Sequence, residues 1–553
     1  MDFLSELQRE RYGYIPKIPL ILEQNATDIV VKTGSAILQS ENHEQIQKEF
    51  PLTAGRPELS FVKGQNEEGG KKRRVGVLLS GGQAPGGHNV IAGIFDALKQ
   101  ANPDSTLYGF HLGPGGLVKG DSEILEKQKI DEYRNTGGFD IIGSGRTKIE
   151  TEDQIAKTID TVKKLRLDAL IIIGGDDSNT NAAFLAECFE QNKIKCCVIG
   201  VPKTIDGDLK NNFIETSFGF DTATKVYSAL IGSLSRDTMS SKKYWNFVKL
   251  MGRSASHIAL ECALQVHPNV TLIGEEIAAK NMGLAQILHD ICSVIAKRAE
   301  KGLNFGTILI PEGIVEFIPE TANLINELNR NWVEYEKVFT ALTTLESKKK
   351  WLKSRISSAA FDTLELLPPE LAEQFLGLRD PHGNIIVSQI ETEKLFIIMC
   401  KNYLETMQGI GTYKGKFSPM ALFYGYEGRS VFPSNFDCNY CYALGKAAFL
   451  LAANNANGYI TCIKNLASSP DKWLAGGVPL TMMMGMETRK GKLKPVVSKS
   501  LVDITAPAFR EFEKHRDEWA VNTDYRFPGP IQYYGPPAVC DRITETLRLD
   551  STR

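Results

Sequence analysis

Short apolar runs alternate with glycine-rich loops and amphipathic segments in the first half of the chain. The apolar run 75–79 is followed by the loop 80–87 and then by the helical pattern of residues 88–100. Further apolar runs enter loops at 139–146, at 167–173 before the loop 174–178 and the helical pattern 179–191, and at 196–201 before the loop 202–208. Strands that alternate with helices predict a parallel sheet flanked by helices. In such a sheet ligands bind beyond the carboxyl ends of the strands, which is where all of these loops fall.

A second αβ pattern follows over about residues 216–318. It contains helical stretches near 221–234 and 253–265 and an apolar strand at 306–313. Residues 320–400 are richer in Leu, Glu and Lys and predict a helical insertion, whereas residues 1–70 carry a mixed helical pattern and form an N-terminal extension. A chain of 553 residues is too long for one ordinary domain, so we expect an α/β protein with more than one folding unit.

Composition narrows the class of protein. Hydrophobic residues make up 42% and charged residues 24% of the chain, and 64 basic residues nearly balance 66 acidic ones. No global field therefore attracts nucleic acid or an anionic membrane, and an anionic ligand must be held locally. No apolar run approaches the roughly 20 residues that span a bilayer, and the N-terminus does not resemble a signal peptide. Ten cysteines are too dilute for a disulfide scaffold, so we expect reduced thiols and a cytoplasmic protein.

The loop SGGQAPGG (80–87) is suited to binding phosphate. It lacks the Walker A ending and does not fit GxGxxG. Its glycines still allow the backbone to approach an anion closely, and the helix that follows directs free N–H groups at it. Glycine-rich turns between strands and helices are common, so an ordinary turn is the alternative.

The loop GGDDS (174–178) places two carboxylates directly after a strand. Asp177 or Ser178 could simply cap the following helix. Adjacent carboxylates repel a phosphate unless a divalent cation lies between them. Because Mg²⁺ is held by one or two carboxylates together with phosphate oxygens, Asp176 is a candidate metal ligand.

The loop PKTIDGD (202–208) supplies a base and a cation. Asp206 and Asp208 can accept a proton from a hydroxyl or orient it, and Lys203 offers a positive charge to a phosphate. The alternative is a turn rich in Asp that stabilises only itself.

These motifs together resemble the phosphofructokinases. SGGQAPGG, GGDDS, PKTIDGD and LMGRSASHIAL stand in the order of that family's GGDAPG, GGDGS, TIDND and MGR, and the resemblance covers about residues 75–315 before it resumes at 425–445. It implies two Rossmann-like domains, with fructose 6-phosphate bound between them. The implied donor domain comprises residues 71–215 and about 430–553, and the implied sugar-phosphate domain comprises 216–319 and about 401–429.

The resemblance also implies roles for individual residues, and Mg²⁺ as the cofactor. Asp206 would take the proton of the sugar's C1 hydroxyl, with Asp208, Lys203 and Arg253 as further catalytic residues, and Asp176 would serve the metal. The implied donor contacts are Gly82, Arg146, Asp177 and Lys203. The implied sugar contacts are Thr204, Ile205, Asp206, Met251, Gly252, Arg253, Glu312, Tyr426, Glu427, Gly428 and Arg429. Lys243 and Tyr244 match positions that reach the 6-phosphate from a partner subunit, which implies a homodimer.

Two departures from the ATP-using pattern favour pyrophosphate as the donor. Asp177 replaces the last glycine of GGDGS, and Lys203 directly precedes Thr204. A carboxylate at 177 fills the space that the α-phosphate of a nucleotide would need, and its negative charge repels that phosphate. Both residues are similar to those of the pyrophosphate-dependent branch. That branch makes fructose 1,6-bisphosphate reversibly in glycolysis and gluconeogenesis. The alternatives are an ATP-dependent enzyme of this fold, a non-catalytic regulatory subunit, or a GGDG-bearing kinase of lipids or dinucleotides, which lacks TIDGD and MGR.

Overall fold

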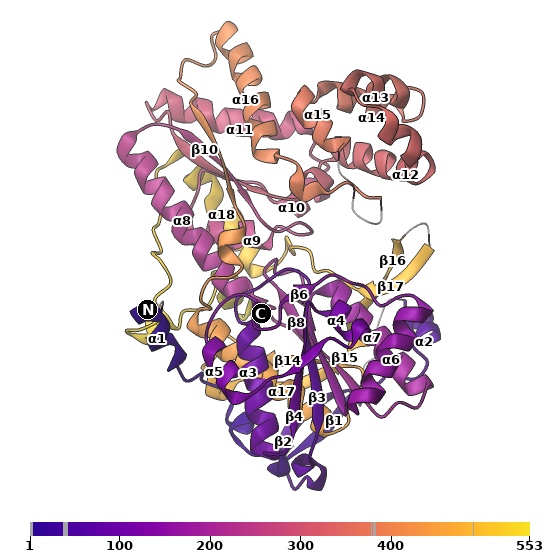
Figure 1. Ribbon diagram of the computed structural model, residues 1–553. Helices are drawn as coiled ribbons and strands as arrows, with labels where there is room; N and C mark the ends of the chain where they lie inside the picture. Colours follow the sequence, from indigo (N-terminus) through magenta and orange to yellow (C-terminus); the bar gives the residue numbers. More distant parts are fainter. Residues whose placement is uncertain (1–3, 37–41, 378, 380–382, 490–491, 553) are drawn as a thin grey trace. The chain divides into compact units, whose positions relative to one another are not determined.

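The computed structural model describes residues 4–36, 42–377, 379, 383–489 and 492–552 (Figure 1). The chain divides into two compact units. Unit 1 comprises the chain up to Ala223 together with Tyr426–Ser500 and Ile531–Ile543. Unit 2 comprises Thr224–Gly425, Leu501–Pro530 and the chain from Thr544 onward. From the sequence we expected residues 501–530 and the chain from Thr544 in the donor domain, and residues 426–429 in the sugar-phosphate domain.

Unit 1 is built on a mixed sheet. Within the described residues the sheet has eleven strands. Its main path runs, in order, through β1 (Ile29–Ala36), β2 (Pro57–Lys63), β15 (Leu474–Pro479), β14 (Tyr459–Lys464), β8 (Cys197–Thr204), β7 (Ala169–Gly174), β3 (Arg74–Ser80), β4 (Thr106–Phe110) and β5 (Ser122–Ile124), with β6 (Ser144–Gly145) beside β3 and β9 (Phe218–Gly219) beside β8. The central strands β3, β7 and β8 pair in parallel. The predicted strand at 139–146 is wrong except for the two residues of β6.

Helices cover both faces of this sheet, as the near-continuous apolar runs of its parallel strands require. Ile171, Ile173 and Ile199 of β7 and β8 are all fully buried. One face carries α3 (Gly87–Ala101) and α17 (Asn435–Ala453); the other carries α2 (His43–Glu49), α4 (Pro114–Lys119), α6 (Glu152–Leu165) and α7 (Asp176–Gln191) (Figure 1). A Cβ at Gly93 would lie 2.3 Å from the Tyr442 carbonyl oxygen, so glycine is what lets α3 and α17 approach so closely.

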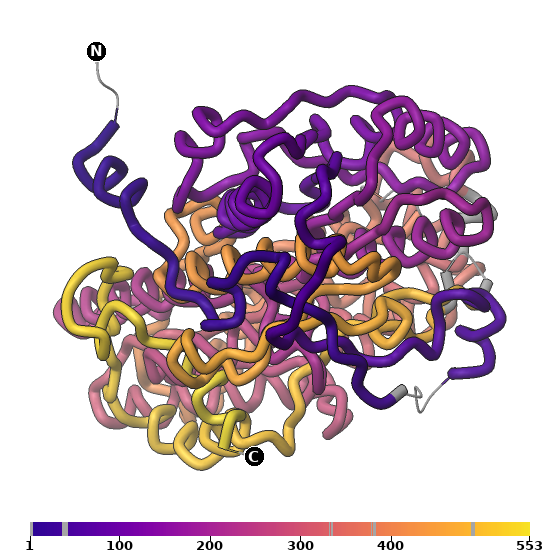
Figure 2. Tube along the Cα trace, turned by 90° about the horizontal axis from the view of Figure 1, so that it is seen from below, coloured from indigo at the N-terminus to yellow at the C-terminus, as the bar shows by residue number. Residues whose placement is uncertain are grey.

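The N-terminal extension is part of this unit rather than a mainly helical appendage. Its strands β1 and β2 pair antiparallel, and β2 continues the sheet beside β15. The segment before them, which begins with α1 (Glu6–Tyr12) and is drawn in indigo in Figure 2, contacts α17 through hydrogen bonds. Tyr14 Oη donates to Asn439 Oδ1 (3.0 Å), and Lys446 Nζ donates to the Leu22 carbonyl (2.8 Å).

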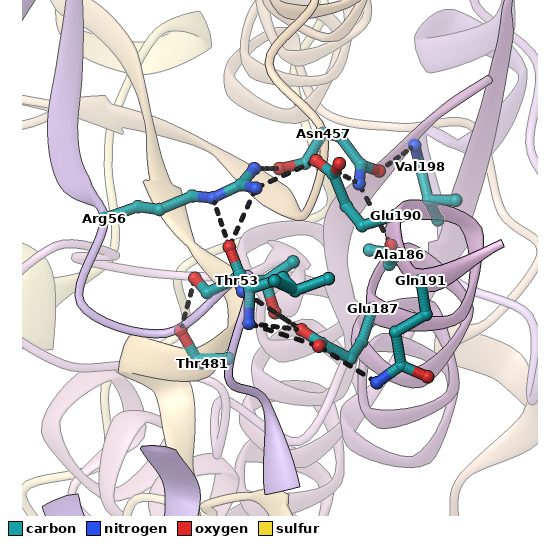
Figure 3. A network of polar contacts seen from close by, with 10 residues as sticks. Thr53, Arg56, Ala186, Glu187, Glu190, Gln191, Val198, Asn457 and Thr481 are labelled. Carbon is teal, nitrogen blue, oxygen red and sulfur yellow. Dashed lines mark hydrogen bonds and ion pairs between the residues drawn. The ribbon is translucent and has the colours of Figure 1, made fainter. Parts of the chain in front are cut away.

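The chain just before β2 also holds the carboxyl-terminal half of α7 in place (Figure 3). The buried carboxylate of Glu187 accepts hydrogen bonds from the Thr53 backbone N–H (3.0 Å) and hydroxyl (2.7 Å). Arg56 donates from Nη2 to Glu190 (2.8 Å) and from Nη1 to the Asn457 carbonyl (2.6 Å). The opposite end of α7 begins at Asp176, so this clamp fixes the helix that carries the GGDDS carboxylates.

Unit 2 contains a smaller sheet whose four strands, among the described residues, are all parallel: β11 (Val270–Thr271), β12 (Gly306–Pro311), β10 (Trp245–Leu250) and β13 (Pro419–Tyr424), in that order. The helices packed on or near it are α8 (Phe220–Ser241), α9 (His257–Val266), α11 (Leu284–Glu300), α16 (Thr392–Gly409), α18 (Pro507–Val521) and α20 (Glu545–Asp550). The predicted helical insertion folds as α12 (Pro319–Ala341), α13 (Leu345–Leu352), α14 (Ser358–Leu366) and α15 (Pro369–Phe375), followed by α16. Its apolar side chains share one core with β10, β12 and α11.

The cysteines and the longest helices bear on the redox and membrane questions. All ten cysteines are free. Cys438 and Cys441 are fully buried in α17, which fits a packing role rather than a metal site. Within the described ranges, no helix is both long and apolar enough to cross a bilayer.

We expect Glu187→Ala to lower the free energy of unfolding of unit 1 by about 2–4 kcal/mol, because it leaves buried N–H donors without an acceptor. Urea unfolding followed by circular dichroism measures the change. Glu49→Ala, at an exposed position of the neighbouring α2, is the control and should shift the transition by less than about 0.5 kcal/mol. Equal shifts in the two variants would show that the contacts between Glu187 and Thr53 do not stabilise unit 1.

Candidate active site

Three of the predicted loops meet at one edge of the unit 1 sheet. β3, β7 and β8 are neighbours and run in parallel, so the loops that leave their carboxyl ends at 80–87, 174–178 and 204–208 are adjacent. The Ser178 hydroxyl donates to the Ser80 hydroxyl (2.8 Å) and joins the first two loops. Unit 1 thereby brings together the three motifs that the sequence analysis selected from this part of the chain.

The Lys203 side chain lies at the centre of these loops. It is only 7% exposed, and its ammonium donates to the Gly82 carbonyl (2.8 Å). A Cβ added to Gly81 would lie 3.3 Å from this nitrogen, and one added to Gly175 would lie 4.0 Å from it. Burial lowers the pKa of Lys203 to about 8, although the carboxylates of Asp206 and Asp176 oppose the shift. The positive charge is therefore held close to both glycine-rich loops.

Two arginines converge on Gly82 in the same unit. A Cβ at this position would lie 2.5 Å from Arg429 Nη2 and 3.7 Å from Arg146 Nη2. Arg429 also donates to the Gln83 side chain, and its guanidinium lies over the Tyr426 ring at 5.3 Å. Arg429 thus contacts the loop 80–87. Glycine-rich backbone and two guanidinium groups make this end of the site suited to an anion.

The two carboxylates of GGDDS stand in the first turn of α7. The helix begins at Asp176 with Gly175 as its N-cap, and no side chain caps it, so the interpretation of Asp177 or Ser178 as a cap is wrong. Lys499 Nζ lies 3.5 Å from Asp176 Oδ2, and Lys148 Nζ lies 3.3 Å from Asp177 Oδ1. Neither lysine could be found from the sequence, because neither stands in a motif and Lys499 is more than 300 residues away from its partner.

The loop 204–208 is ordered by Thr204. The Asp206 backbone N–H donates to the Thr204 hydroxyl (3.0 Å), and the Thr204 side chain hydrogen-bonds Asp208. Burial, together with the negative charges of Asp206 and Asp176, raises the pKa of Asp208 to about 7. Asp208 and Ile205 are buried, whereas Asp206 is half-buried. The turn does stabilise itself, as the alternative interpretation required, but through Thr204, and Asp206 is the more accessible carboxylate.

The carboxylates here fit a hard divalent cation. Among the described residues, no group of three or more His, Cys, Asp or Glu side chains could hold a metal ion by itself. Mg²⁺ needs only one or two protein carboxylates when phosphate oxygens and waters complete its shell. Asp176 is half-buried and interacts with Asp208 and Lys203. It therefore has the donor atoms and the setting that Mg²⁺ requires when a phosphate is also bound.

Unit 2 holds the remaining motif at the carboxyl ends of β10 and β12. The Gly252 N–H donates to Glu312 Oε2 (3.1 Å), and the residue Glu312 is 4% exposed. The Met251 N–H donates to the Tyr424 carbonyl (3.1 Å). Arg253 is exposed beside them. A φ of +123° at Gly252 lets the backbone turn here, so this unit brings together Met251, Gly252, Arg253 and Glu312.

Lys243 and Tyr244 lie on the loop that enters β10 and are both exposed. Tyr244 has a φ of +70°, which is rare for a bulky residue, and its carbonyl accepts from the Gly306 N–H (3.1 Å). Strained backbone of this kind persists where the surrounding structure fixes it, frequently at functional positions.

Comparison with known proteins assigns the family. The phosphofructokinase family profile matches residues 74–350. The chain is 51% identical to a pyrophosphate–fructose 6-phosphate 1-phosphotransferase of Treponema pallidum over 99% of this chain and 97% of that protein, and 50% identical to the same enzyme of Porphyromonas gingivalis over 99% of each. A crystal structure of a pyrophosphate-dependent phosphofructokinase from Nitrosospira multiformis, 17% identical, superposes with a TM-score of 0.53 over 86% of this chain and 96% of that one. The chain therefore belongs to the phosphofructokinase family.

Proposed function

We propose that this chain transfers a phosphoryl group from pyrophosphate to the C1 hydroxyl of fructose 6-phosphate, giving fructose 1,6-bisphosphate and phosphate. The reaction runs in either direction and belongs to glycolysis and gluconeogenesis. Full-length relatives at about half identity carry the name of this activity. The observation that carries the proposal is the buried Lys203 ammonium, which donates to the Gly82 carbonyl between the two glycine-rich loops. Asp177 stands in the first turn of α7, directly after the second of these loops.

Unit 1 binds the donor in this proposal. Lys203, Arg146 and the N–H groups of the loop 80–87 neutralise the phosphates of pyrophosphate, and Gly82 lets them approach the backbone. Asp177 excludes a nucleotide, since its exposed carboxylate would meet an α-phosphate with bulk and negative charge. A compact donor that ends at its second phosphate avoids this repulsion.

Asp206 accepts the proton of the C1 hydroxyl and directs the oxygen toward the transferred phosphorus. Asp208, buried behind it, orients the loop and adjusts the charge around the base. Unit 2 binds the sugar phosphate through Met251, Gly252, Arg253 and Glu312, with Thr204, Ile205 and the segment Tyr426–Arg429 completing the sugar contacts. Arg253 meets the charge that develops on the transferred group.

Asp176 is the residue that would hold Mg²⁺. The ion, when bound, neutralises phosphate charge and orients the donor. The carboxylate at the start of α7 contributes the hard oxygen ligand that such an ion prefers.

A homodimer in the cytoplasm is the assembly and location that we propose. The loop at 243–244 would complete the 6-phosphate site of the partner subunit. Two features support this role: Lys243 is exposed, and the backbone at Tyr244 is strained. Free thiols at all ten cysteines support a reducing compartment.

The same-fold alternative is an ATP-dependent enzyme, and the initial rates with pyrophosphate and with ATP, at matched Mg²⁺ and fructose 6-phosphate, decide between them. We expect pyrophosphate to be strongly preferred. In Asp177→Gly, ATP should become a measurable donor because the carboxylate no longer repels its α-phosphate. A wild-type protein that prefers ATP would overturn the proposed donor. A wild-type protein with no turnover on either donor would favour the regulatory-subunit alternative.

Asp206→Asn should reduce turnover about 10²–10⁴-fold, the usual cost of losing a general base, while fructose 6-phosphate binding changes little. Steady-state kinetics and direct sugar-phosphate binding measure the two effects. Asp160→Asn, at an exposed position of α6, removes the same charge from the same unit and should leave both unchanged. Turnover within threefold of wild type would remove Asp206 from the role of base.

The lowered pKa of Lys203 predicts a basic limb in the pH profile of kcat/KM for pyrophosphate. The ammonium is charged below its pKa of about 8 and becomes neutral above it, so donor capture by the free enzyme should fall as the pH rises through 8. Lys203→Arg keeps its charge throughout this range and should lose that limb even where its absolute rate is lower. An identical limb in both proteins would assign it to another group.

A further inference from the structure

The segment Val497–Ser500 is hydrogen-bonded to α7 and to the loop 204–208 of unit 1. It follows β17 (Lys492–Val497), which pairs antiparallel with β16 (Met484–Arg489). The Val497 N–H donates to the Thr180 hydroxyl of α7 (2.8 Å), and the Ser500 N–H donates to the Asp208 carbonyl (2.6 Å). Because hydrogen bonds fix both of its ends, the segment holds the backbone of Lys499 next to the loops 174–178 and 204–208.

Lys499 carries its charge into the carboxylate cluster. Its ammonium lies 3.5 Å from Asp176 Oδ2, and both side chains remain about a quarter exposed, at 26% and 28%. Burial raises the pKa of Asp208, and the Lys499 ammonium opposes that shift. The lysine therefore acts on two carboxylates of the site from a part of the chain that no motif marks.

The Lys499 ammonium is better able than that of Lys203 to follow the phosphates of a bound pyrophosphate. Lys203 is buried and already donates to the Gly82 carbonyl, so its freedom to follow the donor is small. Lys499 is partly exposed, and its amine stands on a flexible four-carbon stem. With Mg²⁺ held at Asp176, the Lys499 ammonium would lose this carboxylate as its partner and would be available to a phosphate oxygen of the donor.

We propose that Lys499 is a donor-binding residue: its ammonium pairs with Asp176 while the site is empty and moves to a phosphate oxygen when pyrophosphate and Mg²⁺ enter. The inference rests on the proposed function and adds a residue to its donor site. In this arrangement the Lys499 ammonium balances the charge of Asp176 in the empty site.

Calorimetric titration of the full-length protein with pyrophosphate in the presence of Mg²⁺, without sugar phosphate, tests the contact directly. Lys499→Met should weaken pyrophosphate binding by about 10- to 100-fold, the effect of losing one charge-assisted hydrogen bond. Lys499→Arg should restore part of the affinity. Lys494→Met, which removes one charge from an exposed position of β17, should bind as wild type does. Thermal unfolding checks that each variant is folded.

A second titration with Mg²⁺ alone separates binding from packing. Removing the competing ammonium should tighten metal binding about threefold or more in Lys499→Met, because Asp176 loses its partner. Tighter metal binding together with unchanged pyrophosphate affinity would overturn the donor contact, and so would pyrophosphate affinity equal to that of Lys494→Met. A wild-type protein that does not bind pyrophosphate would instead refute the proposed function itself.

Discussion

The buried ammonium of Lys203 is the interaction on which the donor side of this protein depends. It lies between two glycine-rich loops and donates to the Gly82 carbonyl, and a side chain at Gly81 would crowd it. Burying a lysine is costly unless other groups compensate, and here burial lowers its pKa while the carboxylates of Asp206 and Asp176 pull the pKa back up. The acidic loops thus keep the lysine charged at neutral pH, and the lysine allows the acidic loops to gather at one sheet edge.

That gathering depends on how firmly α7 is placed, and much of its support comes from the N-terminal extension. Glu187 and Glu190 lie toward the end of α7 remote from Asp176, and Thr53 and Arg56 bind them from the chain that enters β2. Because a helix moves nearly as a rigid body, fixing one end also fixes the carboxylates at the other. The extension therefore does more than lengthen the sheet, since it adds to the rigidity of the donor loops.

The sequence predicted the parts of this arrangement that depend on local pattern. The runs 75–79, 167–173 and 196–201 predict β3, β7 and β8, because strands buried on both faces must be continuously apolar. The N-terminal strands were missed, since a sheet edge recruits them through backbone pairing that periodicity does not reveal. Lys148 and Lys499 were missed for a related reason. Their roles follow from where folding brings them, and neither belongs to a motif.

Charge also explains why a small donor suits these loops. Asp176, Asp177, Asp206 and Asp208 put four carboxylates on two adjacent loops, and each of the first two already faces a lysine. An arriving anion has to be met by more positive charge than the loops alone retain, which a divalent ion and mobile ammonium groups supply. Pyrophosphate concentrates its charge within the reach of these cations. A nucleotide would extend the anion toward Asp177, where the carboxylate repels the added phosphate at close range.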